Sequence, residues 1–282
     1  MKLFKIVLID WKISVRKKLR YIVLILVSYI NCCQFKTGYL DAGIRCDKIF
    51  LADCLAFMQQ GVQPLKYLSG MDEYYIPPAW ILWLFIIFLA PLDYPGKSKN
   101  LWGCQYIIRM NKSYWWFSKC IYTVFVNLWS FSIYIITVVA FCLANGYVIS
   151  FKYNESIYEY LFGNMVKVNG SIFTEWNNIV GLIMLPIVAI IAISYIQLLL
   201  SVYVNPVIAY ACTIIGLMIS AYDSKFWLLG NSLMAVRLSL FTANGVKIEN
   251  ALVFCIVVCI TVIVIGLILV KKYDFGLCKE EE

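Results

Sequence analysis

The sequence predicts an all-α integral membrane protein with six transmembrane helices, an N-terminal interfacial amphipathic helix and both termini in the cytoplasm. Its composition is the first reason, because 62% of the 282 residues are apolar and only 14% are charged. A soluble domain has about 25% charged residues. The second reason is the presence of long uncharged stretches, since about 20 apolar residues in a helix cross the hydrocarbon core.

Five stretches lack any charged residue. They are Tyr21–Phe35, Tyr74–Leu92, Cys120–Phe151, Trp176–Tyr222 and Asn250–Val270. The fourth is long enough for two crossings and has Asn205 and Pro206 near its middle. The five stretches therefore predict six crossings, and helices satisfy the backbone hydrogen-bonding groups within lipid.

The distribution of charge predicts the orientation. With a cytoplasmic N-terminus, fifteen of the 24 Lys and Arg residues fall on inner segments and ten of the 16 acidic residues fall on outer ones. This bias follows the positive-inside rule. The net charge of +8 is therefore interpreted as a topology signal, and we expect no nucleic-acid partner.

Residues 1–20 are predicted to form an interfacial amphipathic helix, which leaves residues 21–282 as the transmembrane domain. Apolar side chains repeat along one side and cations along the other: Phe4, Leu8, Trp11 and Val15 against Lys5, Lys12, Arg16 and Arg20. This pattern is typical of helices that lie on anionic membranes. The alternative is a basic flank that only orients the first crossing.

The first crossing is predicted from about Arg20 to Phe35, which is short for a full span. The outer loop that follows, 36–73, contains an apolar patch from Ile49 to Met58 that we place on the bilayer surface. Pro77 and Pro78 begin the second crossing, where proline in the first helical turn loses no needed hydrogen bond.

Residues 93–119 form the most informative inner segment. Its first part can form a short helix that includes Tyr106 and Arg109. Asn111 or Ser113 is positioned to cap the next helix, which continues into the third crossing. Trp115, Trp116 and Lys119 are expected to anchor the start of that helix at the membrane interface.

The second half of the chain contains three further crossings. The fourth and fifth turn near Tyr203–Pro206 and are expected to pack as an antiparallel pair. Tyr210, Thr213 and Ser220 give the fifth crossing a polar face, which either lines a substrate path or makes hydrogen bonds between helices. Residues 223–249 are predicted to form an outer re-entrant hairpin, and the alternative is an amphipathic helix on the outer surface.

Several kinds of chemistry are missing from the sequence. It contains no histidine, no charged residue within the apolar stretches and no G-x-x-x-x-G-K-[ST] nucleotide loop. We therefore expect no enzyme activity, no metal site and no bound cofactor in this chain. Proton coupling is also disfavoured, because it requires a titratable group inside the membrane. Cys46 and Cys54 either pair as a disulfide or remain thiols.

One inner segment and the overall layout resemble the ABC-2 type permease family, the membrane subunits of ATP-binding-cassette exporters. The residues that carry the resemblance are the amphipathic start, the turn at Asn205 and Pro206, the hairpin before the last crossing, and an inner run of Gly103, Tyr106, Arg109, Lys112, Ser113, Trp115, Trp116 and Lys119. The resemblance implies that the segment 93–119 docks on a separate ATPase. The implied coupling residues are Tyr106, Arg109, Asn111, Lys112, Ser113, Trp115 and Trp116.

The expected function is export across a bacterial plasma membrane. The resemblance implies two permease chains, identical or different, and two ATPase subunits that bind the ATP and Mg²⁺. The expected substrate is an amphipathic peptide, an antibiotic or a lipid-like molecule. The alternatives are a non-transporting membrane scaffold or sensor, and an ion-coupled secondary carrier.

Overall fold

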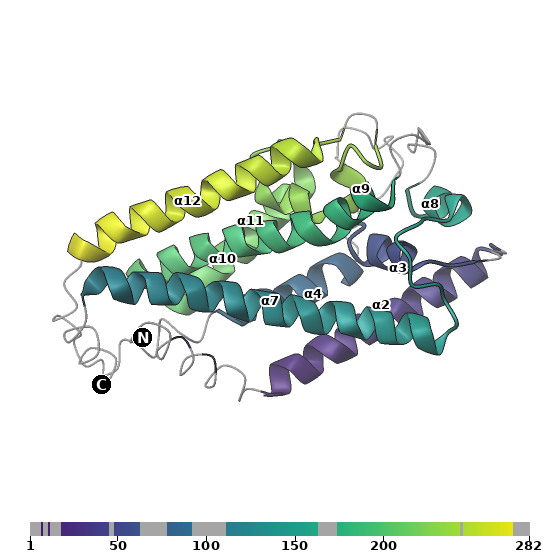
Figure 1. Cartoon of the computed structure of the whole chain (residues 1–282), viewed down its shortest axis with the longest axis horizontal. Helices are drawn as coiled ribbons and strands as arrows, with labels where there is room; N and C mark the ends of the chain where they lie inside the picture. Colours follow the sequence, from purple (N-terminus) through teal and green to yellow (C-terminus); the bar gives the residue numbers. More distant parts are fainter. Residues whose placement is uncertain are drawn as a thin grey trace.

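The chain is described by a computed structural model that covers residues 7, 11, 18–44, 48–62, 78–91, 111–162, 174–242 and 245–272. Within these residues the regular structure is helical. The helices, in chain order, are α2 (Lys18–Asp41), α3 (Leu51–Met58), α4 (Pro78–Leu89), α7 (Lys112–Ala144), α8 (Glu155–Phe162), α9 (Glu175–Ile179), η3 (Val180–Met184), α10 (Leu185–Tyr203), α11 (Pro206–Tyr222), η4 (Leu229–Leu233), η5 (Ala235–Arg237) and α12 (Ile248–Lys272). The longest helices run along the length of the molecule (Figure 1).

Four helical segments of the described chain are long and apolar enough to cross a membrane. They are α2, α7, the continuous run α9–η3–α10 and α12. Two further apolar helices, α4 and α11, have 12 and 17 residues. Apolar side chains such as Leu26 and Ile260 are exposed on α2 and α12, as expected for surfaces that face lipid.

The first of these four helices is longer than the first predicted crossing. α2 has 24 residues and continues past Phe35 to Asp41. Lys36 does not end the helix, because its ammonium group donates to Asn145 Oδ1 at 2.7 Å, at the C-terminal cap of α7. The predicted crossing ended at Phe35 because the next residue is charged. A lysine with a fixed polar partner is compatible with the interior of a helix, so α2 continues past Lys36.

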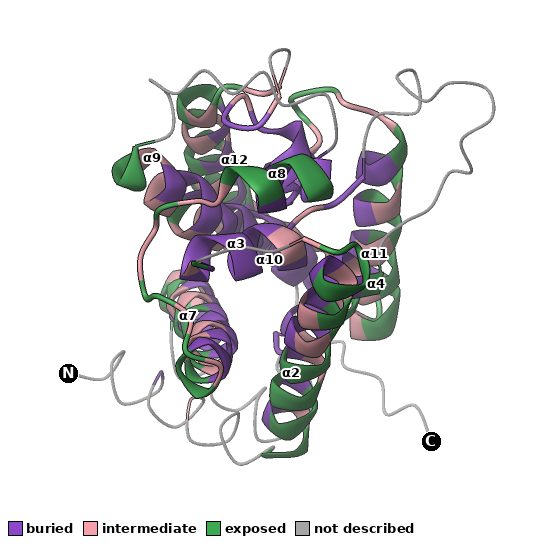
Figure 2. Ribbon diagram, turned by 90° about the vertical axis from the view of Figure 1, so that its right-hand side faces the viewer, coloured by how far each residue is buried: buried purple, intermediate pink, exposed green. Residues whose placement is uncertain are grey.

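The segment Ile49–Met58 does not lie on a surface, so that expectation is wrong. Residues 51–58 form α3, whose residues are buried except for Phe57 (Figure 2). We define the cap as α3, α8 and residues 229–242. Within it, the rings of Phe162 and Phe241 stack with centroids 4.9 Å apart. Burial of an apolar segment between helices removes more hydrocarbon from water than a surface position would.

A glutamine joins the cap to a distorted turn of a spanning helix. Pro186 has no N–H to donate to Leu182, which removes one hydrogen bond of the α-helical pattern. The amide of Gln59 donates to the Leu182 carbonyl oxygen at 3.0 Å, inside the π-helical turn η3. The backbone carbonyl of Gln59 in turn accepts from the N–H of Ala235 at 2.6 Å. The side chain of Gln59 thus compensates for a proline, while its backbone holds the cap.

Residues 229–237 form two short 3₁₀ turns whose residues are mostly buried. Arg237 holds the segment in place by donating to the carbonyl oxygens of Val62 and Ala221 at 2.5 and 2.6 Å. The indole of Trp80 in α4 donates to the carbonyl of Leu233 at 2.9 Å. Before the start of α12, the described residues of the segment 223–249 therefore form 3₁₀ turns. The amphipathic surface helix, which was the alternative for this segment, is absent from them.

The connection between α10 and α11 has the expected tight geometry. Only Val204 and Asn205 separate the two helices, and the Asn205 side chain caps α11 by accepting from the Val207 N–H at 2.9 Å. Pro206 occupies the first helical position, where its missing N–H costs nothing. Two helices joined by so short a turn pack as an antiparallel pair, as predicted.

The predicted N-terminal helix lies outside the described residues, except for isolated positions and its last three residues. Trp11 is described, and its ring meets those of Phe125 and Trp129 in α7 with centroids 6.1 and 5.4 Å apart. Cys46 also lies outside them, so the suggested Cys46–Cys54 pair stays a prediction. The Sγ atom of Cys54 lies 3.6 Å from that of Cys142, and both are free thiols.

Candidate functional site

The predicted coupling segment is described only from Asn111 onward. Tyr106 and Arg109 lie outside the described residues, whereas Asn111, Lys112, Ser113, Trp115 and Trp116 form the start of α7. Of the two possible caps, the structure uses Asn111, whose side chain accepts from the Ser113 N–H at 3.1 Å. The following 33 residues form one unbroken helix. The residues before Asn111 are thus followed directly by a single long helix.

Trp116 joins the start of α7 to the last turns of α12. Its buried indole donates to the carbonyl oxygen of Ile263 at 3.0 Å. A Cβ atom at Gly266 would approach the Trp116 ring to within 2.0 Å, so only glycine leaves room for it. Lys112 also donates to the carbonyl of Lys271 at 3.4 Å. Cations near a helix C-terminus complement its partial negative charge.

Trp115 and Lys119 lie inside the bundle, and their expected position at the membrane interface stays a prediction. Trp115 packs against residues of α10 and α12, among them Leu198 and Val270. The ammonium of Lys119 lies 5.5 Å from the centre of the Trp115 ring, and this lysine is only 3% exposed. The aromatic face and the packing of the aliphatic stem account for a cation in this position.

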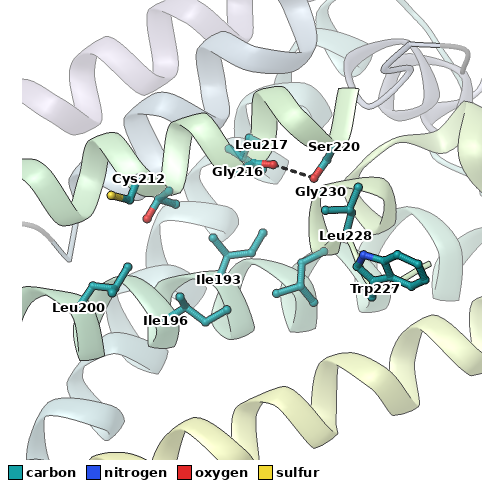
Figure 3. A pocket seen from close by; sticks show the side chains of 12 residues that line it. Ile193, Ile196, Leu200, Cys212, Gly216, Leu217, Ser220, Trp227, Leu228 and Gly230 are labelled. Atoms are coloured by element: carbon teal, nitrogen blue, oxygen red, sulfur yellow. Dashed lines mark hydrogen bonds between the residues drawn. The ribbon is translucent and has the colours of Figure 1, made fainter. Parts of the chain in front are cut away.

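A half-open cavity of about 180 Å³ separates α10, α11 and the segment that follows α11 (Figure 3). Its lining residues are Ile193, Ile196, Leu200, Cys212, Thr213, Gly216, Leu217, Ser220, Trp227, Leu228, Leu229 and Gly230. Most of these side chains are apolar, so the cavity favours hydrocarbon over a polar solute.

Two of the three residues predicted to line a substrate path belong to this cavity. Thr213 and Ser220 line it, and Tyr210 does not. The Thr213 hydroxyl donates within α11 to the carbonyl of Ala209 at 2.9 Å. The Ser220 hydroxyl donates to the carbonyl of Gly216 at 2.8 Å (Figure 3). The Tyr210 hydroxyl donates to the carbonyl of Phe85 in α4 at 3.2 Å. The role of these three residues in a substrate path stays a prediction. The bond from Tyr210 to Phe85 joins α11 to α4, so Tyr210 makes the kind of hydrogen bond between helices that was the alternative to lining a path.

A set of buried polar residues was missed by the sequence reasoning, apart from Lys119, which was expected at the membrane interface. They are Ser28 and Asn31 in α2, Lys119, Thr123, Asn127, Ser130 and Tyr134 in α7, and Ser194, Gln197 and Ser201 in α10. Each is at most 3% exposed. The spacing of the α7 residues by four, four, three and four places them on one face. This helical spacing is visible in the sequence and is the signal that locates the polar face of α7.

Three contacts connect the helices that carry these residues to α4. Asn31 donates to the carbonyl of Ala79 at 3.1 Å, and Gln197 donates to the carbonyl of Phe88 at 3.0 Å. In α7, the Tyr134 ring stacks on Trp83 of α4 with centroids 4.7 Å apart. The polar faces of α2, α7 and α10 therefore each reach the same short apolar helix.

Comparison of the chain with protein-family models, with curated protein sequences and with solved structures found no match.

Proposed function

We propose that this chain is the permease subunit of an ATP-binding-cassette exporter of the ABC-2 type, with six membrane crossings. Four helices are long enough to cross by themselves. α11, with 17 residues, matches the lower end of the usual range of about 17–25. α4, with 12 residues, completes the set as a short helix that packs against α2 and α7.

The proposed orientation places both termini in the cytoplasm. The excess of Lys and Arg on the predicted inner segments supports it. The start of α7 and the end of α12 then face the cytoplasm, and the cap faces the outside of a bacterial plasma membrane. Lys271 and Lys272 at the end of α12 agree with this orientation.

The observation that carries the proposal is the construction of α7. Its 33 residues extend over about 50 Å, which exceeds the thickness of the hydrocarbon core. The last five of the proposed coupling residues, from Asn111 to Trp116, form the start of this helix, and Trp116 joins it to α12. A push on the inner segment would therefore move two helices together, as expected of a permease driven from the cytoplasm.

The energy then comes from a partner. Two ATPase subunits would bind ATP and Mg²⁺ and close on two permease chains, while this chain has no enzymatic role. Tyr106 and Arg109, followed by Asn111, Lys112 and Ser113, would contact the ATPase. The buried Trp115 and Trp116 would instead pass the movement on to the bundle. The proposed cargo is an amphipathic peptide, an antibiotic or a lipid-like molecule, and the apolar cavity beside Thr213 and Ser220 supports cargo with an apolar part.

Co-purification tests the proposal. The tagged chain, extracted in mild detergent from the cells that naturally express it, should carry an ATPase with a nucleotide-binding loop. Arg109→Glu should reduce the amount of bound ATPase at least tenfold, because it reverses a charge at the proposed contact. Lys152→Glu, a charge reversal beside the cap, should leave the amount unchanged. Equal recovery with Arg109→Glu would count against the proposed contact, and absence of an ATPase from the wild type would count against the proposed function.

A further inference from the structure

The polar faces of α2, α7 and α10 include several residues that have no hydrogen-bond partner within the described part of the chain. Both amide atoms of Asn127, the hydroxyls of Ser28 and Ser194, and the Oε1 atom of Gln197 are buried and unsatisfied. By contrast, Thr123 and Ser130 donate to carbonyls one turn earlier in α7, at 2.9 Å in both cases. The unsatisfied atoms are therefore distinct from ordinary helix side chains that bond to their own backbone.

Leaving such atoms without a partner is costly. A buried donor or acceptor that loses its partner costs about 1–3 kcal/mol, and more in hydrocarbon, where no water compensates. Asn127 contributes both a donor and an acceptor and lies near the midpoint of α7. Buried polar groups on three packed helices imply that something else supplies their hydrogen bonds.

The chemistry of the partner follows from the side chains. The groups are amides and hydroxyls, which donate and accept, and they include no carboxylate. The nearby cations are already engaged, since Arg20 donates to the carbonyl of Ala90 at 3.0 Å and Lys119 lies over Trp115. An uncharged ligand with both donors and acceptors fits this site, whereas a free ion does not.

We propose that the polar faces of α2, α7 and α10 are hydrated, and that Asn127, Ser194, Ser28 and Gln197 there bind uncharged hydrogen-bonding groups. Water is the resident ligand, and amide or hydroxyl groups of a cargo molecule have the same chemistry. The site differs from the apolar cavity beside α11, since the two share no lining residue. Its use as part of a transport path rests on the proposed function, but its hydration does not.

Cysteine substitution tests the hydration. Asn127→Cys and Ser194→Cys are introduced into the full chain in native membranes and treated with iodoacetamide, a small neutral amide. Alkylation is followed at each position by mass spectrometry of the peptides. A thiol reacts as the thiolate, which forms in water and not in hydrocarbon. Both cysteines should therefore react at least about tenfold faster than a cysteine that faces lipid.

Leu128→Cys is the matched control, because it is the next residue of α7 and is 38% exposed on the outer face. Exposure alone would make the cysteine at position 128 react faster than the one at position 127. The proposal predicts the opposite order of alkylation rates, because position 127 is in contact with water and position 128 faces lipid. If Asn127→Cys fails to fold, the reaction of Ser194→Cys tests the proposal by itself. This variant replaces only an oxygen atom by sulfur and should therefore keep the fold. Reaction of the folded variants no faster than Leu128→Cys would overturn the proposal. The experiment needs no ATPase, so its failure is separable from failure of the proposed function.

Discussion

At the scale of single residues, Asp53 shows how burial and hydrogen bonding compete. This carboxylate in the cap is fully buried and accepts from the N–H groups of Phe50 and Asn154 at 2.9 and 3.0 Å. Burial disfavours its charged form more strongly than these two bonds favour it. The result is a pKa raised from 3.8 to about 7.

This raised pKa predicts a dependence of stability on pH. Between about pH 4 and pH 7 the folded chain keeps the proton of Asp53, while the unfolded chain has lost it. Because the folded state binds more protons, stability falls as pH rises through this window and then levels off above it. The unfolding temperature of the wild type in detergent should therefore fall between pH 4 and pH 7. The Asp53→Asn variant has no titrating group at this position and should not show this fall.

The Asp53→Asn variant should be less stable overall, because its NH₂ group opposes one of the two backbone donors. Its difference from the wild type should shrink as pH rises from 4 to 7. A difference that stays constant over this range would contradict the raised pKa.

At the scale of elements, the contact between α7 and α12 depends on the absence of a side chain at Gly266. Gly266→Ala would place a Cβ atom within 2.0 Å of the Trp116 ring and force the helices apart or the ring out. Such overpacking costs about 1–3 kcal/mol. We predict a lower unfolding temperature in detergent and, in the complex, ATPase binding without transport.

Gly216→Ala is the control for this prediction. A Cβ atom at Gly216 in α11 would meet nothing within 4 Å, and alanine favours a helix by up to about 1 kcal/mol over glycine. This variant should be neutral or slightly stabilised. If both variants unfold at the wild-type temperature, the close approach of Trp116 to Gly266 does not hold the helices together.

The spanning helices could be predicted from the sequence, and the cap could not. A helix that crosses lipid must consist largely of uncharged residues, and such stretches can be recognised in the sequence. The helices α7, α10, α11 and α12 therefore lie where they were expected. The apolar run Ile49–Met58 has the same composition whether it lies on a membrane or in a core. Only the assembled helices reveal the space that α3 fills, because that space is formed by residues distant in the sequence.

The candidate sites show the same division. The cap of α7 at Asn111 follows from local preferences, and sequence spacing could also have located Asn127 on a polar face of α7. The contact of Trp116 with Gly266 joins residues 150 positions apart and has no local signal. The compensation of Pro186 by Gln59 likewise needs the structure, since any of several polar side chains could have supplied the missing donor.

At the scale of the whole molecule, the orientation makes a direct prediction. Tyr114 and Trp176 are exposed and lie near the starts of α7 and of the α9–α10 run. Cysteines at these positions should react with a membrane-impermeant maleimide from opposite sides, Tyr114→Cys from the cytoplasm and Trp176→Cys from outside. Labelling of both from the same side would exclude the six-crossing arrangement.

The central claim is that a nucleotide-hydrolysing partner moves the permease through the segment that precedes α7. The most direct measurement is the rate of ATP hydrolysis by the purified complex in lipid vesicles, with wild-type permease and with Arg109→Glu at equal amounts of ATPase. We predict that stimulation of hydrolysis by the permease and its cargo is lost in the variant. An unchanged rate, or transport of cargo by the permease alone without ATP, would contradict the account.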